Sequence, residues 1–212
     1  MQIIPRIKEI LDAQPEDALL DKFIADIRDG LATSNKQFIS LSVLVITALA
    51  TYHLVAYEGA SGITLNSIRI SDATLFRRVF LVVPATLLGA MSCVGYLRRW
   101  QREVYDYLAI SRCRVFGKTG LHELRLPPDY ILGLFVLGKE GGFIGKAISH
   151  TVAFLTGFVF TFAPALYIVR AAAENIVTFG ASDIDALAAS VVAIVLSLCS
   201  VVIVHLAGRV RP

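Results

Sequence analysis

The chain has 212 residues, of which 56% are apolar and 17% are charged, and it carries a formal net charge of +3. Soluble domains have about 25% charged residues, so this composition argues against a soluble domain. The three cysteines are an odd number without a CxxC pair, which argues against a disulfide framework.

Residues 1–36 form the first predicted region, a cytoplasmic segment with an amphipathic helix over residues 16–33. Apolar residues recur there at steps of three and four: Leu19, Leu20, Phe23, Ile24, Ile27 and Leu31. The region has seven acidic and five basic side chains and no apolar h-region, so we expect no cleavable signal peptide. Because the helix is acidic on balance, we expect it to pack on the cytoplasmic loop of its own or a neighbouring subunit. The alternative is a helix on the membrane surface.

Four stretches of the chain lack Asp, Glu, Lys and Arg and are long enough to cross a bilayer. They cover residues 37–57, 79–97, 147–169 and 186–208, which are 21, 19, 23 and 23 residues long. A hydrocarbon core about 30 Å thick needs about 20 helical residues at 1.5 Å each. The sequence therefore predicts an all-α integral membrane protein with four transmembrane helices, since little polar sequence is left to cover them in a soluble fold.

Transmembrane helices 1 and 2 occupy residues 37–97, with an outer loop at residues 58–78. That loop is rich in glycine and then alternates apolar and polar residues, which predicts either a short hairpin or an irregular cap. Helices 3 and 4 and a short cytoplasmic tail occupy residues 147–212. In the second outer loop, residues 170–185, Ser182 is the expected N-cap of the last helix.

The basic residues predict the orientation. The N-terminal region, the cytoplasmic basic loop at residues 98–146 and the C-terminus carry five, nine and two of them, which is sixteen of the twenty. The two outer loops carry the other four, two of which are Arg77 and Arg78. Because positive residues remain in the cytoplasm, we expect both termini inside (N-in/C-in). Arg77 and Arg78 oppose this bias slightly, and we expect them to snorkel to lipid headgroups.

The loop at residues 98–146 is predicted to begin as a helix that continues the second span. Trp100, Val104, Tyr107 and Leu108 fall on one apolar stripe of this helix, opposite a charged face. Further along, the apolar residues 130–138 are too few to span a membrane as a helix. They are either an interfacial segment or a packing surface for a partner.

The basic run at the start of this loop has two parts. Arg98, Arg99 and Trp100 follow 19 apolar residues directly, so we predict that they mark the cytoplasmic lipid boundary. Four basic residues lie beyond that boundary and are candidates for binding an acidic protein partner: Arg112, Arg114, Lys118 and Arg125. The alternative for the first three is contact with the acidic N-terminal helix. We expect no direct contact with nucleic acid.

Inside the predicted spans, small residues recur at steps of four, which lets helices approach closely in lipid and indicates a compact bundle or a homo-oligomer. The candidates for helix packing are Gly89, Gly157, Ala189, Ala193 and Ser197. Three hydroxyl residues share a face of the first span: Ser40, Thr47 and Thr51. They either bond carbonyls of their own helix or line a weakly polar path. The absence of ionisable carboxylates, Lys and Arg from the spans argues against a coupled transporter.

We find no catalytic signature, such as GxSxG, HExxH or a phosphate-binding loop, and predict no enzyme, cofactor or metal site. Of the four histidines, His150 and His205 lie near the cytoplasmic ends of their spans, but a metal site needs three or four ligands.

The four apolar spans and the segment "YLRRWQREVYDYLAISRCRVF" give a layout that resembles the membrane subunit of the bacterial Kiwa anti-phage system. The resemblance covers most of the chain and is one of layout, so it transfers no functional residue. It implies a homo-oligomeric sensor in the bacterial inner membrane that binds a soluble, DNA-binding cytoplasmic subunit. We therefore expect a sensor or anchor subunit that recruits a soluble partner; the alternative is a small oligomeric channel or pore-forming effector.

Overall fold

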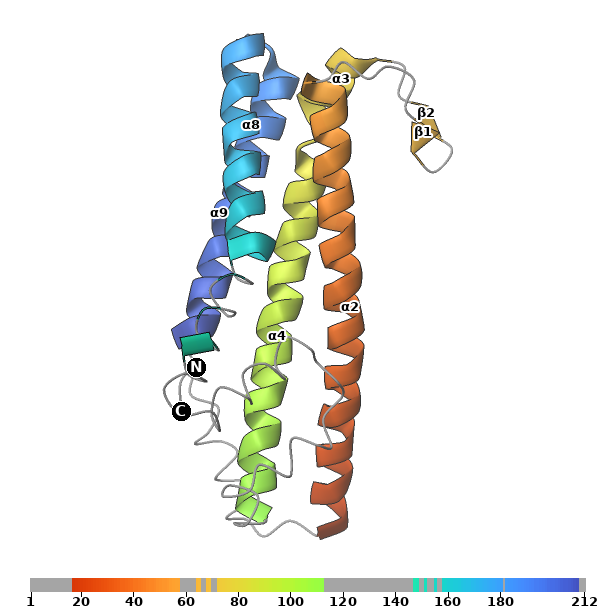
Figure 1. Ribbon diagram of the computed structural model, residues 1–212, viewed down its shortest axis with the longest axis vertical. Coiled ribbons are helices and arrows are strands. Elements are labelled where there is room, and N and C mark those ends of the chain that lie inside the picture. Colours follow the sequence, from red (N-terminus) through yellow and green to blue (C-terminus); the bar gives the residue numbers. More distant parts are fainter. Residues whose placement is uncertain are drawn as a thin grey trace.

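A computed structural model of the protein is shown in Figure 1. The residues that it describes are 17–57, 64–65, 68–69, 72–112, 147–148, 151, 155, 158–180 and 182–209. They are helical almost throughout, as the sequence predicts.

Four long helices lie side by side along the long axis of the molecule (Figure 1). They are α2 (Asp17–Tyr57), α4 (Val82–Arg112), α8 (Ala163–Phe179) and α9 (Ile184–Arg209), and a short π-helix, η2 (Phe158–Phe162), leads into α8. Short elements lie near one end, which we call the α3 end: α3 (Ala73–Val79) and the strands β1 (Thr64–Leu65) and β2 (Ile68–Arg69). The two strands pair antiparallel, with Leu65 opposite Ile68, which matches the hairpin alternative for this loop.

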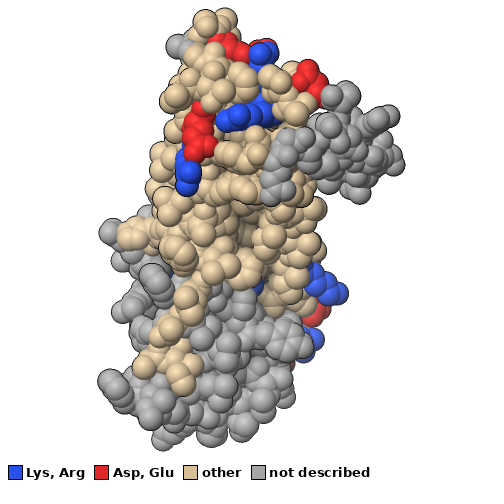
Figure 2. Space-filling view, turned by 45° about the horizontal axis from the view of Figure 1, so that its top comes forward, with Lys and Arg blue, Asp and Glu red and all other residues tan. Residues whose placement is uncertain are grey.

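Three helical stretches are long and apolar enough to cross a membrane: Leu19–Tyr57, Ala73–Ser111 and Ile184–His205. The first two contain the first and second spans predicted from the sequence, and the third covers residues 186–205 of the fourth predicted span, residues 186–208. Figure 2 shows a broad uncharged band between the charged side chains of the α3 end and those farther along the bundle. These features indicate a multi-pass membrane protein. The third predicted span begins in residues that are mostly outside the described part of the chain, so it stays a prediction.

The amphipathic N-terminal helix and the first span are one continuous helix. α2 has 41 residues, and the boundary that the sequence places between residues 36 and 37 does not interrupt it. The reason is that residues 34–37 contain neither glycine nor proline, and the buried positions continue across them at three- and four-residue steps. At 1.5 Å per residue the helix is about 60 Å long, twice the thickness of a bilayer core.

The first part of α2 packs against the last part of α4. We call this antiparallel pair, residues 17–36 with residues 98–112, the stalk; α2 and α4 alone among the labelled helices reach this end of the molecule (Figure 1). Its apolar seam consists of Leu20, Ile27, Leu31, Val104, Tyr105, Leu108 and Ala109. The expectation that the amphipathic helix packs on the following loop of its own subunit is therefore confirmed for these residues.

A glycine of α2 faces the side chain of Gln101 of α4 in the stalk. A Cβ added at Gly30 would lie 2.8 Å from the amide nitrogen of Gln101, and that amide accepts a hydrogen bond of 2.9 Å from the Ser34 hydroxyl. Gly30 therefore makes room for a polar contact between α2 and α4, instead of weakening the end of a helix as its propensity alone suggests.

The main core lies where α2, α4, α8 and α9 meet. It combines large apolar side chains, such as Leu81, Leu88 and Ile168, with small ones such as Ala172 and Ala193, all of which are buried. The small residues let α9 lie close to α4 and α8, and large residues fill the space left between them.

The connection between α8 and α9 differs from the predicted loop. α8 continues ten residues past the predicted end of the third span at Val169, to Phe179, and the chain then turns at Gly180, whose φ is 76°. Glycine adopts this left-handed backbone conformation without a steric penalty. The N-cap of α9 is Asp183, whose carboxylate accepts a hydrogen bond of 3.2 Å from the Ala186 amide. The prediction of Ser182 as the cap was wrong by one residue.

Candidate functional site

The three predicted lipid-boundary residues lie at the base of the stalk, each against a partner from the protein. The Arg98 guanidinium lies 4.8 Å from the ring centroid of Phe38, a cation–π contact between α4 and α2. The Arg99 Nε is 3.1 Å from a carboxylate oxygen of Glu103, one helical turn away. Trp100 packs on the apolar seam of the stalk. A position at the lipid boundary stays a prediction for all three.

The predicted partner-binding residues fall largely outside the described part of the chain. Arg112 is the last residue of α4, whereas Arg114, Lys118 and Arg125 lie outside the described residues, as do residues 130–138. Arg112 lies 14 positions after Arg98 (112 − 98) in the same helix, so the end of α4 lies about 20 Å beyond the predicted boundary.

The predicted helix-packing residues of α9 lie within the bundle. Ala193 and Ser197 are fully buried, Ala189 is nearly so, and a Cβ added at Gly89 of α4 would lie 3.7 Å from the Ser200 hydroxyl. These small residues therefore serve contacts between helices of one chain. Gly157 lies outside the described residues.

The hydroxyl residues of the first span are divided between two environments. The Thr51 hydroxyl is buried and donates a hydrogen bond of 2.8 Å to the Thr47 carbonyl, one turn earlier in the same helix. Ser40 and Thr47 are exposed on the surface of α2. A path lined by Ser40 and Thr47 would therefore run between copies of the chain and not through its core.

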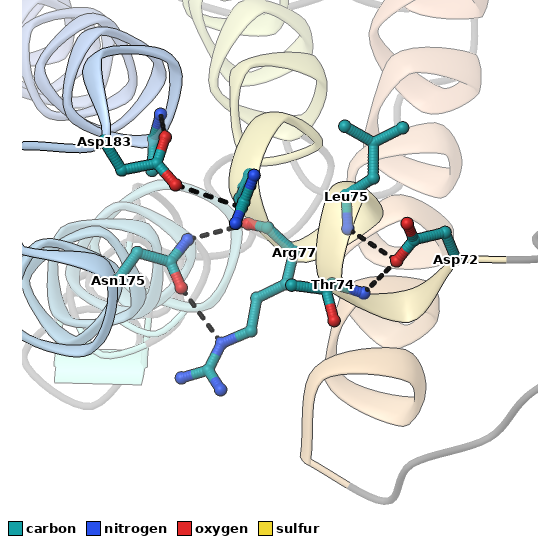
Figure 3. Close-up of polar contacts among 8 residues, drawn as sticks. Asp72, Thr74, Leu75, Arg77, Asn175 and Asp183 are labelled. Carbon is teal, nitrogen blue, oxygen red and sulfur yellow. Dashed lines mark hydrogen bonds and ion pairs between the residues drawn. The ribbon is translucent and has the colours of Figure 1, made fainter.

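A buried polar network at the α3 end is the most specific arrangement in the described residues, and the sequence did not predict it. Its centre is Asn175 of α8, which is fully buried. The Asn175 amide oxygen accepts hydrogen bonds from the Tyr52 hydroxyl, at 3.2 Å, and from the Arg77 Nε, at 3.0 Å. The amide nitrogen donates to the Arg77 carbonyl at 2.8 Å (Figure 3). We call Tyr52, Arg77 and Asn175 the Asn175 network; it joins α2, α3 and α8.

Glu174, the neighbour of Asn175, joins α8 to the end of α2. Its carboxylate accepts a short hydrogen bond from the Tyr57 hydroxyl and another, of 2.8 Å, from the Arg170 Nε. The hydrogen bond from Tyr57 and the one from Arg170 both lower the pKa of the Glu174 carboxyl. Close to these groups, the His53 Nδ1 lies 2.9 Å from the Tyr167 hydroxyl, a second polar contact between α2 and α8.

Arg78 attaches α3 to the beginning of α9. Its Nε lies 3.1 Å from a carboxylate oxygen of Asp183, and its guanidinium lies 5.2 Å from the ring centroid of Phe179. At the other end of α3, the Asp72 carboxylate accepts hydrogen bonds from the Thr74 and Leu75 amides (Figure 3). Arg77 and Arg78 therefore hold α3 against α8 and α9. From the sequence, both side chains were expected to extend to lipid headgroups, and these contacts with the protein were not predicted.

The sequence contains one indication of the Asn175 network, but the residue that carries it, Asn175, was placed in a predicted loop. Asn175 follows Glu174 and precedes the apolar residues 176–177, and polar residues next to an apolar helical stretch usually have a specific partner. Because the third span was expected to end at Val169, Asn175 fell in the predicted outer loop, where a polar side chain predicts no buried contact. Its partner Arg77 is 98 residues away, a separation that only the folded arrangement brings together.

Comparisons with protein-family models, with curated proteins and with solved structures found no match. The likeness to the Kiwa membrane subunit therefore rests on layout alone.

Proposed function

We propose that the protein is a homo-oligomeric anchor or sensor subunit of a bacterial inner membrane, with four spans and both termini inside, that recruits a soluble partner. The observation that carries this proposal is the stalk. A span needs about 20 residues, yet α2 has 41 and α4 has 31. Both helices continue beyond that length as a packed pair, which gives the membrane part a rigid extension for a partner to bind.

The surface of the stalk supports this proposal. Near its end Leu19 and Phe23, one turn apart on α2, are 60% and 47% exposed, and Ile110 of α4 is 39% exposed. Large apolar side chains that lie next to one another in water, as Leu19 and Phe23 do, are typical of an interaction surface. The α2 face also carries the carboxylates of Asp26 and Asp29, so a partner with apolar and basic groups would suit it.

The proposed orientation follows from the basic residues, sixteen of which lie in the segments assigned to the cytoplasm. It places the stalk inside the cell and the α3 end outside. A role in anti-phage defence, with a DNA-binding protein as the soluble partner, follows only from the likeness to the Kiwa subunit.

A pull-down from membranes of the native host tests the recruitment. Residues 113–146 are replaced by a Gly/Ser linker of equal length, because this leaves the described part of the stalk intact. The control replaces residues 59–71, on the proposed outer side, in the same way. We expect the first variant to lose a soluble partner that the wild-type protein and the control retain. If both variants retrieve the same proteins as the wild type, recruitment by this loop is wrong.

The second candidate is an ion-conducting oligomer, which the exposed positions of Ser40 and Thr47 favour. Conductance of the purified protein in planar bilayers distinguishes it from an anchor. Substituting both residues by valine would reduce the conductance of a channel that they line. An anchor protein shows no conductance either before or after the substitution.

A further inference from the structure

The guanidinium of Arg77 is held in place at one edge by the Asn175 network. Its Nε donates a hydrogen bond to Asn175 (Figure 3), and the Tyr52 hydroxyl accepts a further hydrogen bond from the Arg77 side chain. The side chain is only partly buried. The N–H donors of this permanent cation that the network does not use remain for a ligand.

The orientation of this group is fixed on its faces as well. The rings of Tyr57 and Phe179 both have their centroids 5.8 Å from the guanidinium carbon of Arg77. Arginine ordinarily loses rotamer entropy when it binds a ligand, but here folding has already restricted the side chain. The planar fork of Arg77 is thus preorganised for an oxyanion that accepts two parallel hydrogen bonds.

The neighbouring arginines show that this arrangement is specific. Arg170 and Arg78 each lie against a carboxylate, whereas Arg77 has the neutral amide of Asn175 as its bonded partner. Glu174 is the acidic group nearby, and both of its oxygens are engaged, one by Tyr57 and one by Arg170. The positive charge of Arg77 is therefore not neutralised by a bonded anion within the described residues.

The position of Arg77 relative to the predicted membrane indicates which class of anion it could bind. It lies between the predicted first and second spans, close to the end of each, where the phosphates of a bilayer leaflet are found. We propose that the terminal nitrogens of Arg77 bind a phosphate oxyanion, of the kind that a phospholipid headgroup carries at this depth. The inference rests on the proposed membrane placement but not on partner recruitment by residues 113–146.

Lipid binding to the full-length protein in detergent, followed by native mass spectrometry, tests this site. The probes are phosphatidylglycerol and a glycolipid with the same acyl chains but no phosphate. Arg77→Gln removes the fork, and Arg28→Gln, on an exposed residue of the stalk, makes the same change of net charge as a control. We expect Arg77→Gln to weaken phosphatidylglycerol binding about tenfold, which corresponds to one charge-assisted hydrogen bond, and Arg28→Gln to have less than a twofold effect.

Two further measurements keep the test decisive. If Arg77→Gln does not fold, the binding of the two lipids to the wild-type protein is compared. The proposed site predicts that the lipid with phosphate binds more tightly. Inorganic phosphate is tested by thermal unfolding: stabilisation that Arg77→Gln abolishes, without lipid selectivity, identifies free phosphate as the source. Equal binding of both lipids together with no effect of inorganic phosphate, or equal loss in both variants, would overturn the proposal. Neither result affects the pull-down described above.

Discussion

Substitution of Asn175 by alanine is expected to cost more stability than any single change on the lipid-facing surface. The change removes three hydrogen bonds. Two join neutral groups: Asn175 with the Tyr52 hydroxyl and Asn175 with the Arg77 carbonyl. The third comes from a charged donor, the Arg77 Nε. Neutral bonds contribute about 1 kcal/mol each and a bond to a charged group about 1.5–3, so the expected loss is about 3 to 5 kcal/mol. Because Tyr52 is fully buried, water cannot replace the lost acceptor.

The assay is reversible unfolding in mixed detergent micelles, followed by circular dichroism. Val177→Ala is the matched control, since Val177 lies on the same helix and is 84% exposed. Asn175→Asp retains the acceptor for Tyr52 and for the Arg77 Nε and gains an opposite charge, so it should recover part of the loss. A double-mutant cycle with Tyr52→Phe should show a coupling free energy of about 1 kcal/mol. If Asn175→Ala unfolds within about 1 kcal/mol of Val177→Ala, the network contributes little and the reasoning is refuted.

Three further outcomes follow from other contacts. Leu108→Ala in the buried seam of the stalk should cost about 2–5 kcal/mol and increase proteolysis within residues 17–36, whereas Ile110→Ala, at an exposed position, should change neither. Gly89→Ala should be tolerated, because its Cβ would be at ordinary contact distance from Ser200. Gly89→Leu should overpack the contact between α4 and α9 and lower the free energy of unfolding by about 1–3 kcal/mol. Equal melting temperatures of the two variants would contradict this expectation. Because the folded pKa of Glu174 is lowered from its usual 4.5, its stabilising effect should be fully present above about pH 4.5 and be lost as the pH falls through the lowered pKa. Unfolding of Glu174→Gln, measured over the same range, should lack that part of the pH dependence.

The sequence predicted four membrane-spanning helices, and three of them lie in helices that are long and apolar enough to cross a membrane, because the signal is local. A run of about 20 residues without charge can be read directly, and α2, α4 and α9 contain such runs. The apolar stripe of residues 98–112 was likewise visible as a period of 3.6, although Tyr105 and Ala109 of the seam were missed. The acidic charge of residues 16–33 favoured packing on the loop of the same or a neighbouring subunit, but it did not show that the apolar stripe of residues 98–112 is the surface that they contact.

The remaining features depend on residues far apart in the chain. The absence of glycine and proline from residues 34–37 permits the helix to continue, but helix propensity is nearly neutral there. The Ser34–Gln101 hydrogen bond between α2 and α4 is a contact that the local sequence does not predict. In the same way Arg78 was interpreted as a lipid contact, since its partner Asp183 lies 105 positions further along the sequence (183 − 78). Polar groups near a membrane boundary have both lipid and protein as possible partners, and composition does not distinguish them.

The unbroken course of α2 has a mechanical consequence. The helix α2 is about 60 Å long, is attached at Tyr57 to α8 and packs on α4 in the stalk, so the packed pair would act as a lever if it tilted as one body. A tilt of about 5° at the α3 end would displace the first turn of α2 by about 5 Å, roughly one helical pitch. A small rearrangement on one side of the membrane would thus be amplified at the far end of the stalk without any helix melting or sliding.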